Sequence, residues 1–202
     1  MNRIIEILIV SLFLFSDVIQ AQNSNNHVSY LNERSAGYMM EYAGGFGMVS
    51  AGIYYKPFKH FEFQSCIGYT PPAYGEIYSV NFLQLYFPFA IKVNNHFNLC
   101  PLAIGAFENF NFGKNILLRW DSRYPVEYYW WNSAFRFGPV AQATLHYKNL
   151  KHNLHPAFFF QCSTNDLYIA SYGNNTTSIK FHEILVYGLG VKIGFSLKPK
   201  NK

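Results

Sequence analysis

Alternation of large apolar side chains with glycine or polar ones is the feature that most limits how this chain folds. It is clearest over residues 185–197, where leucine, tyrosine, valine, isoleucine or phenylalanine occupies every second position from Leu185 to Leu197. The residues between them are mostly glycine, lysine and serine. A period of two puts the two sets on opposite faces of a β-strand. This segment is therefore predicted to be a strand with one apolar face.

The same alternation recurs along the chain and predicts eight strands. Three further segments show it clearly, at 61–70, 82–91 and 135–146. Weaker versions lie at 38–43, 49–55, 97–107 and 154–162. Residues 166–172 either extend the seventh strand, predicted at 154–162, or belong to an additional pair of strands. Ten strands is therefore the alternative count. Four prolines fall within these segments and call for β-bulges or shifted boundaries, because a closed barrel has no edge strand to tolerate them: Pro88, Pro101, Pro139 and Pro156.

Composition indicates which face of the strands points outward. Only 13% of the residues are charged and 19% are aromatic, whereas about 25% are charged in an ordinary soluble domain. A soluble barrel also alternates, but its outer face is charged. Here the non-apolar face holds mainly glycine, serine, threonine and glutamine, which suit the interior of a narrow barrel. The apolar rows, such as Leu83, Leu85 and Phe87 in the fourth strand, are expected to face lipid.

The N-terminus predicts export. Arg3 precedes an apolar stretch over 4–15, and Ala21 offers a small residue for cleavage. This is the pattern of a secretory signal peptide, so residues 1–21 are expected to be a removed leader and 22–202 a single domain.

Beyond the leader, the sequence has no run of about 18 apolar residues, the length that a membrane-spanning helix needs. A closed β-barrel is the other structure that satisfies its backbone groups within lipid. The predicted fold class is therefore all-β, an up-and-down antiparallel transmembrane β-barrel. Short turns at 56–60, 93–96 and 147–153 alternate with longer links at 70–79, 108–132 and 164–178. Outer-membrane barrels have this arrangement, with the short turns on the periplasmic side.

Residues 188–195 resemble the terminal β-signal that the outer-membrane assembly machinery reads. Gly190, Ile193 and Phe195 match that pattern, and Gly188 stands where a polar residue is usual. The chain as a whole resembles the small eight-stranded outer-membrane barrels, such as the OmpA transmembrane domain and OmpX, especially those of Bacteroidota-type bacteria. The resemblance implies a monomeric protein of the Gram-negative outer membrane, in contact with lipid and lipopolysaccharide. It implies no catalytic residue.

Polar residues on the inward faces predict a buried network. Because buried charges must pair, Glu41, Glu62, Arg136 and Lys192 are predicted to form salt bridges inside the barrel. Further side chains assigned to the interior are Gln64, Gln84, Gln142, His146, Gln161 and His182. Side chains fill the interior of an eight-stranded barrel, so no wide channel is expected. Transport of small solutes through a narrow pore stays an alternative function.

The link over 108–132 is the candidate binding segment. It concentrates all three tryptophans with tyrosines and both signs of charge. Trp120, Asp121, Arg123 and Tyr124 are the candidate contact residues, because tryptophan, tyrosine and arginine are enriched at binding hot spots. Residues 128–131, from Tyr128 to Trp131, suit an aromatic girdle at the lipid interface. The predicted role is structural or surface binding.

An enzyme that hydrolyses or transfers lipid A acyl chains is the alternative from another class. It needs a serine, a histidine and an orienting carboxylate, and Ser178, His182 and Asp166 are the candidates.

No cofactor, metal or nucleic acid is expected as a partner. The single histidine pair at ligand-like spacing, His152 and His155, is a weak signal for zinc. Cysteines at 66, 100 and 162 lie on non-adjacent strands and are expected to be free, with a disulfide across the lumen as the alternative. The net charge of +5 arises from lysines in the short turns, Lys56 among them, and suits anionic inner-leaflet phospholipid. The aromatic residues between them are needed for the lipid face, which argues against nucleic acid.

Overall fold

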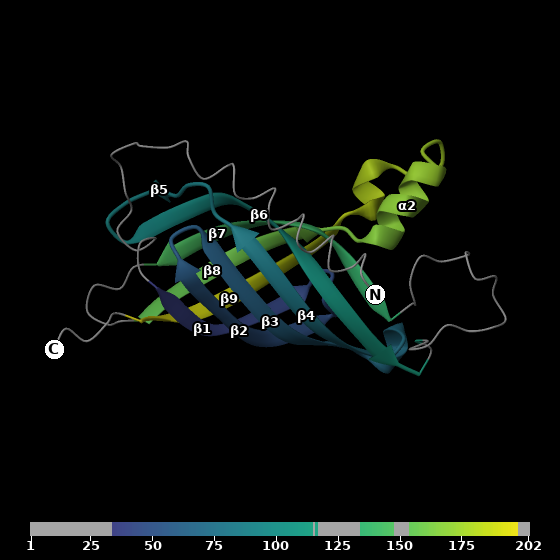
Figure 1. Cartoon of the computed structure of the whole chain (residues 1–202), viewed down its shortest axis with the longest axis horizontal. Helices are drawn as coiled ribbons and strands as arrows, with labels where there is room; N and C mark the ends of the chain where they lie inside the picture. Colours follow the sequence, from purple (N-terminus) through teal and green to yellow (C-terminus); the bar gives the residue numbers. More distant parts are fainter. Residues whose placement is uncertain (1–33, 115, 117–133, 148–153, 198–202) are drawn as a thin grey trace, which may run out of the picture.

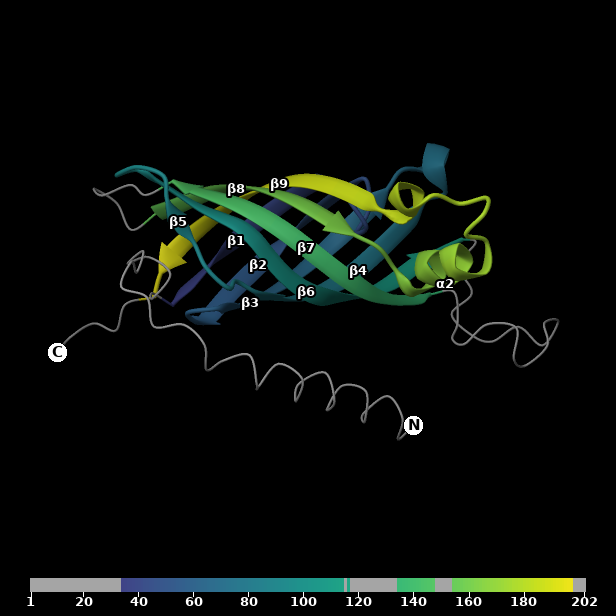
Figure 2. The same ribbon diagram turned by 90° about the horizontal axis from the view of Figure 1, so that it is seen from above.

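The structure, a computed structural model, describes residues 34–114, 116, 134–147 and 154–197. They form a closed β-barrel (Figures 1 and 2). The eight long strands are β1 (Ser35–Ala43), β2 (Val49–Phe58), β3 (Phe61–Thr70), β4 (Ile77–Tyr86), β6 (Phe97–Gly113), β7 (Phe135–Tyr147), β8 (Leu154–Ser163) and β9 (Val186–Ser196). Each pairs antiparallel with the next, and β1 pairs with β9 to close the barrel. The predicted eight-stranded up-and-down barrel is confirmed.

Shorter elements lie in the connections. β5 (Ile91–Lys92) adds two residues to the edge of β6. The helical segments are η3 (Pro72–Tyr74), α2 (Asp166–Asn174) and η4 (Phe181–Ile184). Because residues 166–172 lie in α2, the alternative of ten strands is wrong. No helix within the described ranges is long and apolar enough to cross a membrane.

The two ends of the barrel differ. One end, called the loop end, carries the connections 44–48, 71–76, 114–134 and 164–185. The opposite end, called the turn end, carries 59–60, 87–96 and 148–153. Figures 1 and 2 show α2 at the loop end and β5 at the turn end. Ser35 and Ser196, which begin β1 and end β9, pair at the turn end. The predicted leader, 1–21, lies outside the described residues.

β4 corrects both a boundary and a face. It begins at Ile77, five residues before the predicted segment, and ends at Tyr86. Leu83 and Leu85 point into the barrel, each 1% exposed, whereas Gln84 points outward. Register with β3 explains the reversal, because Leu83 pairs with the inward residue Gln64, and directly opposed residues share a face of a sheet.

The four prolines leave the barrel closed for three different reasons. Pro88 lies beyond β4. Pro101 lies in a bulge where the register of β6 with β7 shifts between Cys100 and Ala103. A bulge accommodates the missing donor. The pairing of β7 with β8 runs from Val140 with Ser163 to His146 with Ala157. Pro139 comes just before Val140 and Pro156 just before Ala157, so both prolines lie outside this set of pairs.

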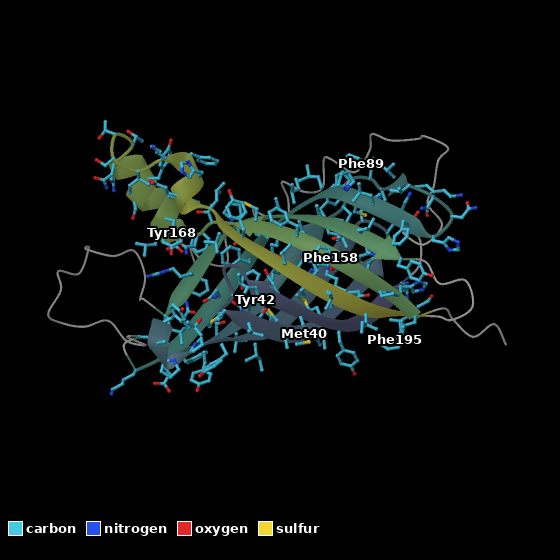
Figure 3. The ribbon with its side chains drawn as sticks, turned by 180° about the vertical axis from the view of Figure 1, so that it is seen from behind. Met40, Tyr42, Phe89, Phe158, Tyr168 and Phe195 are labelled. Atoms are coloured by element: carbon cyan, nitrogen blue, oxygen red, sulfur yellow. The ribbon has the colours of Figure 1, made fainter. Side chains whose placement is uncertain are left out.

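Large apolar side chains cover the outer wall. Figure 3 shows Met40, Tyr42, Phe158 and Phe195 pointing away from the strands. The apolar row of β9 points outward as predicted, and its glycines and Lys192 point inward. The interior is divided between a polar network and a cluster of buried apolar side chains, which are Phe46, Cys66, Leu83, Leu85, Phe87, Cys100, Ala103, Phe107 and Val140.

Candidate functional site

Six buried side chains form a continuous hydrogen-bonded chain inside the barrel, here called the lumen network. Its members are Glu41, Glu62, Gln64, Gln142, Gln161 and Lys192. Lys192 Nζ donates to Glu62 Oε1 at 2.5 Å and to Gln142 Oε1 at 2.8 Å. They come from β1, β3, β7, β8 and β9, so the network joins most of the barrel wall.

The remaining bonds extend the network in both directions. Gln64 Nε2 donates to Glu62 Oε1 at 2.7 Å. On the other side, Gln142 Nε2 donates to Gln161 Oε1 at 3.0 Å. Gln161 Nε2 then donates to Glu41 Oε1 at 3.2 Å. Gln142 and Gln161 each act as both donor and acceptor, which lets their amide groups connect Lys192 to Glu41. Gln64 only donates, and its Oε1 is buried without a partner among the described residues.

Charge in the lumen network is unequal. It holds two glutamates and one lysine. Lys192 forms its ion pair with Glu62, and its Nζ also lies over the Phe159 ring, 5.0 Å from the centroid. Glu41 Oε2 is buried and has no hydrogen-bond partner among the described residues. The carboxylate of Glu41 is therefore the weakly compensated group of the network.

Close packing against β9 depends on glycine. A Cβ at Gly190 would lie 2.2 Å from the Phe159 ring, and one at Gly194 would lie 1.8 Å from the Tyr54 hydroxyl. Since real contacts at a Cβ are not that short, these aromatic side chains occupy the space that glycine leaves free. Inward glycines thus allow an eight-stranded barrel to hold large side chains.

The structure separates Arg136 from the other predicted network members. Arg136 lies at the loop end of β7, where its Nη1 donates to Phe135 O at 2.7 Å and lies 3.8 Å from Asp166 Oδ2. The prediction of salt bridges from Arg136 to the interior glutamates assumed that all inward charges lie at one depth. Asp166, at the start of α2, is the carboxylate that the described residues place beside Arg136.

Two other residues assigned to the interior lie outside it. Gln84 points outward from β4, for the reason of register given above. His182 is exposed in η4 rather than on a strand. Conversely, Lys56 was expected in a turn and is buried inside the barrel, 4% exposed. The alternation of β2 could have indicated this burial. Lys56 lies two residues after the inward Tyr54, and β2 continues to Phe58, so both side chains lie on the same face.

The connection 44–48 folds into the loop end of the barrel, although its paired glycines, Gly44 and Gly45, indicate only a turn. Phe46 is fully buried and meets Phe107 edge to face, with ring centroids 5.2 Å apart. Ser79 Oγ donates to Phe46 O at 2.6 Å, and Asn109 Nδ2 donates to Gly45 O at 3.3 Å. This segment closes the lumen above its apolar cluster and is called the plug loop.

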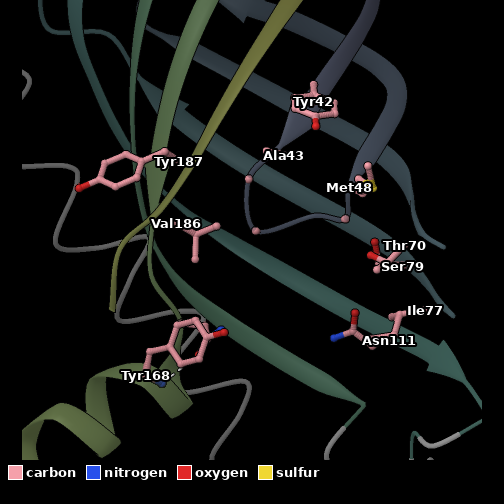
Figure 4. Close-up of a pocket in the computed structure, with 14 residues that line it drawn as sticks. Tyr42, Ala43, Met48, Thr70, Ile77, Ser79, Asn111, Tyr168, Val186 and Tyr187 are labelled. Atoms are coloured by element: carbon pink, nitrogen blue, oxygen red, sulfur yellow. Dashed lines mark hydrogen bonds between the residues drawn. The ribbon is translucent and has the colours of Figure 1, made fainter. Parts of the chain in front are cut away.

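A cavity of about 410 Å³ lies at the loop end, bordered by the plug loop. Figure 4 shows Thr70, Ser79 and Asn111 on one side of it and Tyr168, Val186 and Tyr187 on the other. The remaining lining residues are Tyr42, Ala43, Gly44, Gly45, Gly47, Met48, Ile77 and Asn165. Its volume falls within the usual range for small-molecule sites, about 300–1,000 Å³.

The candidate catalytic residues do not come together. Ser178 and His182 are exposed, and no hydrogen bond joins their side chains. Asp166 Oδ1 accepts from the backbone N–H of Phe137 at 3.2 Å, and Oδ2 faces Arg136. The predicted surface contacts, Trp120, Asp121, Arg123 and Tyr124, lie outside the described residues.

The cysteines at 66, 100 and 162 are not joined by a disulfide bond in the structure, and the first two are buried in the barrel. In the described part of the chain, no three histidine, cysteine, aspartate or glutamate side chains gather as a metal site would require.

Together these features define a small closed β-barrel whose interior is filled by its own side chains. No known family model matches the sequence, and the comparison with curated proteins finds no match.

Proposed function

We propose that the protein is a monomeric β-barrel of the bacterial outer membrane, with a structural or surface-binding role. The main support for this proposal is the composition of the outer wall. Its outward positions are occupied by large apolar side chains on every long strand, for example Tyr38, Ile53, Ile67, Phe82, Ile104, Phe137, Phe158 and Val191. An apolar surface that encircles a protein is unfavourable in water and suits contact with lipid.

Polar exceptions on this wall are few in the described strands. Ser65 and Gln84 face outward on β3 and β4. Glu108 faces outward near the loop end of β6 and pairs with Phe82 and Phe137 on the neighbouring strands. The cost of a charge falls from the bilayer centre towards the interface, so Glu108 is compatible with a wall that spans lipid.

The two longest links between strands, 114–134 and 164–185, join strands at the loop end, and this supports an orientation. Outer-membrane barrels carry short turns on the periplasmic side and longer loops outside. We therefore place the loop end, with α2 and the cavity, at the cell surface. The residues of the predicted β-signal lie on β9, with Ile193 and Phe195 outward and Gly190 inward. These two outward side chains are available to the assembly machinery before β9 meets lipid.

The filled interior favours a structural or binding role over transport. The lumen network crosses the barrel, and the plug loop covers the apolar cluster beside it. An eight-stranded barrel leaves room for side chains but not for a wide aqueous channel.

Fractionation of Gram-negative cells that express the full chain tests this proposal. We expect the protein in the outer-membrane fraction, and we expect faster gel migration before boiling than after it. The same chain purified without detergent is the control. A monomer that stays in solution without detergent, or recovery in the cytoplasmic fraction, contradicts the proposal.

A further inference from the structure

We infer that the loop-end cavity binds an uncharged sugar unit. This inference rests on the proposed surface-binding role and names a site and a ligand class for it. The lining contains tyrosine, asparagine, serine, threonine, glycine and aliphatic side chains, and none of its 14 residues is charged. A buried charge without a partner is unfavourable, so a lining of this kind selects against phosphate and carboxylate groups.

Polar groups in the cavity are available for a ligand. Asn111 lies on the inward face of β6 near its end, and Thr70 ends β3. Within the described chain, neither side chain has a hydrogen-bond partner. An amide offers donors and an acceptor, and a hydroxyl offers both. This mixture matches sugar hydroxyls, each of which donates and accepts, whereas an acyl chain would leave these groups unpaired.

Tyrosine rings and open backbone complete the lining. Asn165 caps α2 by accepting from the N–H of Tyr168 at 2.9 Å, which fixes the start of the helix and places Tyr168 beside the cavity (Figure 4). On the plug loop, Gly44 and Gly47 have positive φ values of 83° and 127°, a conformation that glycine adopts without strain. The absence of side chains there lets a ligand approach the backbone closely.

The cavity is accessible from outside the barrel. Tyr168 is 41% exposed and Met48, on the plug loop, is 36% exposed, so the lining is not sealed. The sugar unit can belong to a free saccharide or to the neutral outer part of a lipopolysaccharide. Both present the same hydroxyl groups to the site, and the experiment has an arm for each source.

Titration of the full chain in detergent micelles tests this inference. The probes are a neutral disaccharide, the same sugar with a phosphate group, and lipopolysaccharide with a neutral outer core. We expect Asn111→Ala and Tyr168→Ala each to weaken binding of the neutral probe about five- to tenfold, the loss of one or two polar or ring contacts. Tyr55→Ala is the matched control, because Tyr55 is 44% exposed on the outer face of β2.

Binding of either neutral source that both cavity variants weaken, and that Tyr55→Ala leaves unchanged, supports the inference. Absence of binding to both sources, equal effects of all three variants, or tighter binding of the phosphorylated sugar overturns it. Gel migration before and after boiling is recorded on each sample, because it reports the folded barrel independently. A folded barrel that binds no sugar rejects the cavity and leaves the proposed membrane location intact.

Discussion

Lys192 Nζ lies 2.5 Å from Glu62 Oε1 inside the barrel, although 130 residues separate the two in the chain. The pair joins β9 to β3 through the lumen, and these strands are not neighbours in the sheet. This interior ion pair therefore connects two non-adjacent strands of the barrel wall and is expected to stabilise the barrel.

Replacing Lys192 tests the contribution of this ion pair to stability. We expect Lys192→Met to lower the free energy of unfolding by about 3–5 kcal/mol, because it leaves Glu62 buried without its ion-pair partner. Denaturant-induced unfolding in detergent micelles, followed by gel migration, measures the change. The double variant Lys192→Met with Glu62→Gln is expected to recover part of the loss. Equal stability of the wild type and Lys192→Met contradicts the buried pair.

Glu41→Gln is expected to have the opposite outcome. The amide oxygen of a glutamine can still accept the hydrogen bond from Gln161, and the substitution removes a buried carboxylate oxygen that lacks a partner in the described structure. We therefore expect the unfolding midpoint to stay the same or rise. A fall as large as that of Lys192→Met indicates that the Glu41 charge is itself needed.

Val191→Arg tests the outer wall. Val191 lies at the centre of β9 and points outward, so an arginine there enters the proposed hydrocarbon region. We expect a loss of about 2–4 kcal/mol of stability in lipid vesicles. The exposed residue Thr176, in the connection to β9, serves for the control Thr176→Arg. If both arginine variants are as stable as the wild type in vesicles, the outer wall does not face lipid.

Phe46→Ala tests the plug loop. We expect a loss of about 3–5 kcal/mol, because the side chain is fully buried against Phe107 and its removal leaves a cavity. We expect planar bilayers to show no new conductance, because the lumen network still crosses the barrel. Discrete channel openings in the variant, absent from the wild type, show instead that the plug loop is the principal closure.

The strands were predictable where one face of a segment is clearly polar. β9 is the plainest case, since glycine and Lys192 alternate with large apolar residues. β4 was not predictable in the same way, because both Phe82 and Leu83 are large and apolar and lie on opposite faces. Local sequence cannot choose between two apolar faces. The register with β3 does so, and register depends on contacts between residues that are distant in the chain.

The interior site was predictable in part for a similar reason. Inward charges must find partners, and this requirement pointed to Glu62 and Lys192. It did not indicate the depth of each residue along the barrel, and Arg136 consequently lies with Asp166 instead. The inward fold of the plug loop has no local sequence signal, because a pair of glycines indicates a turn without indicating its direction.

The tight fit of Gly190 against Phe159, and of Gly194 against Tyr54, bears on how this protein can change over evolution. A larger residue at Gly194 is tolerated only if Tyr54 becomes smaller at the same time. At Gly190 a Cβ would also lie 2.5 Å from the Met40 backbone oxygen, which a smaller ring does not remove. Inherited variation at Gly194 is therefore expected to arise together with a change on β2, whereas Gly190 is expected to stay glycine.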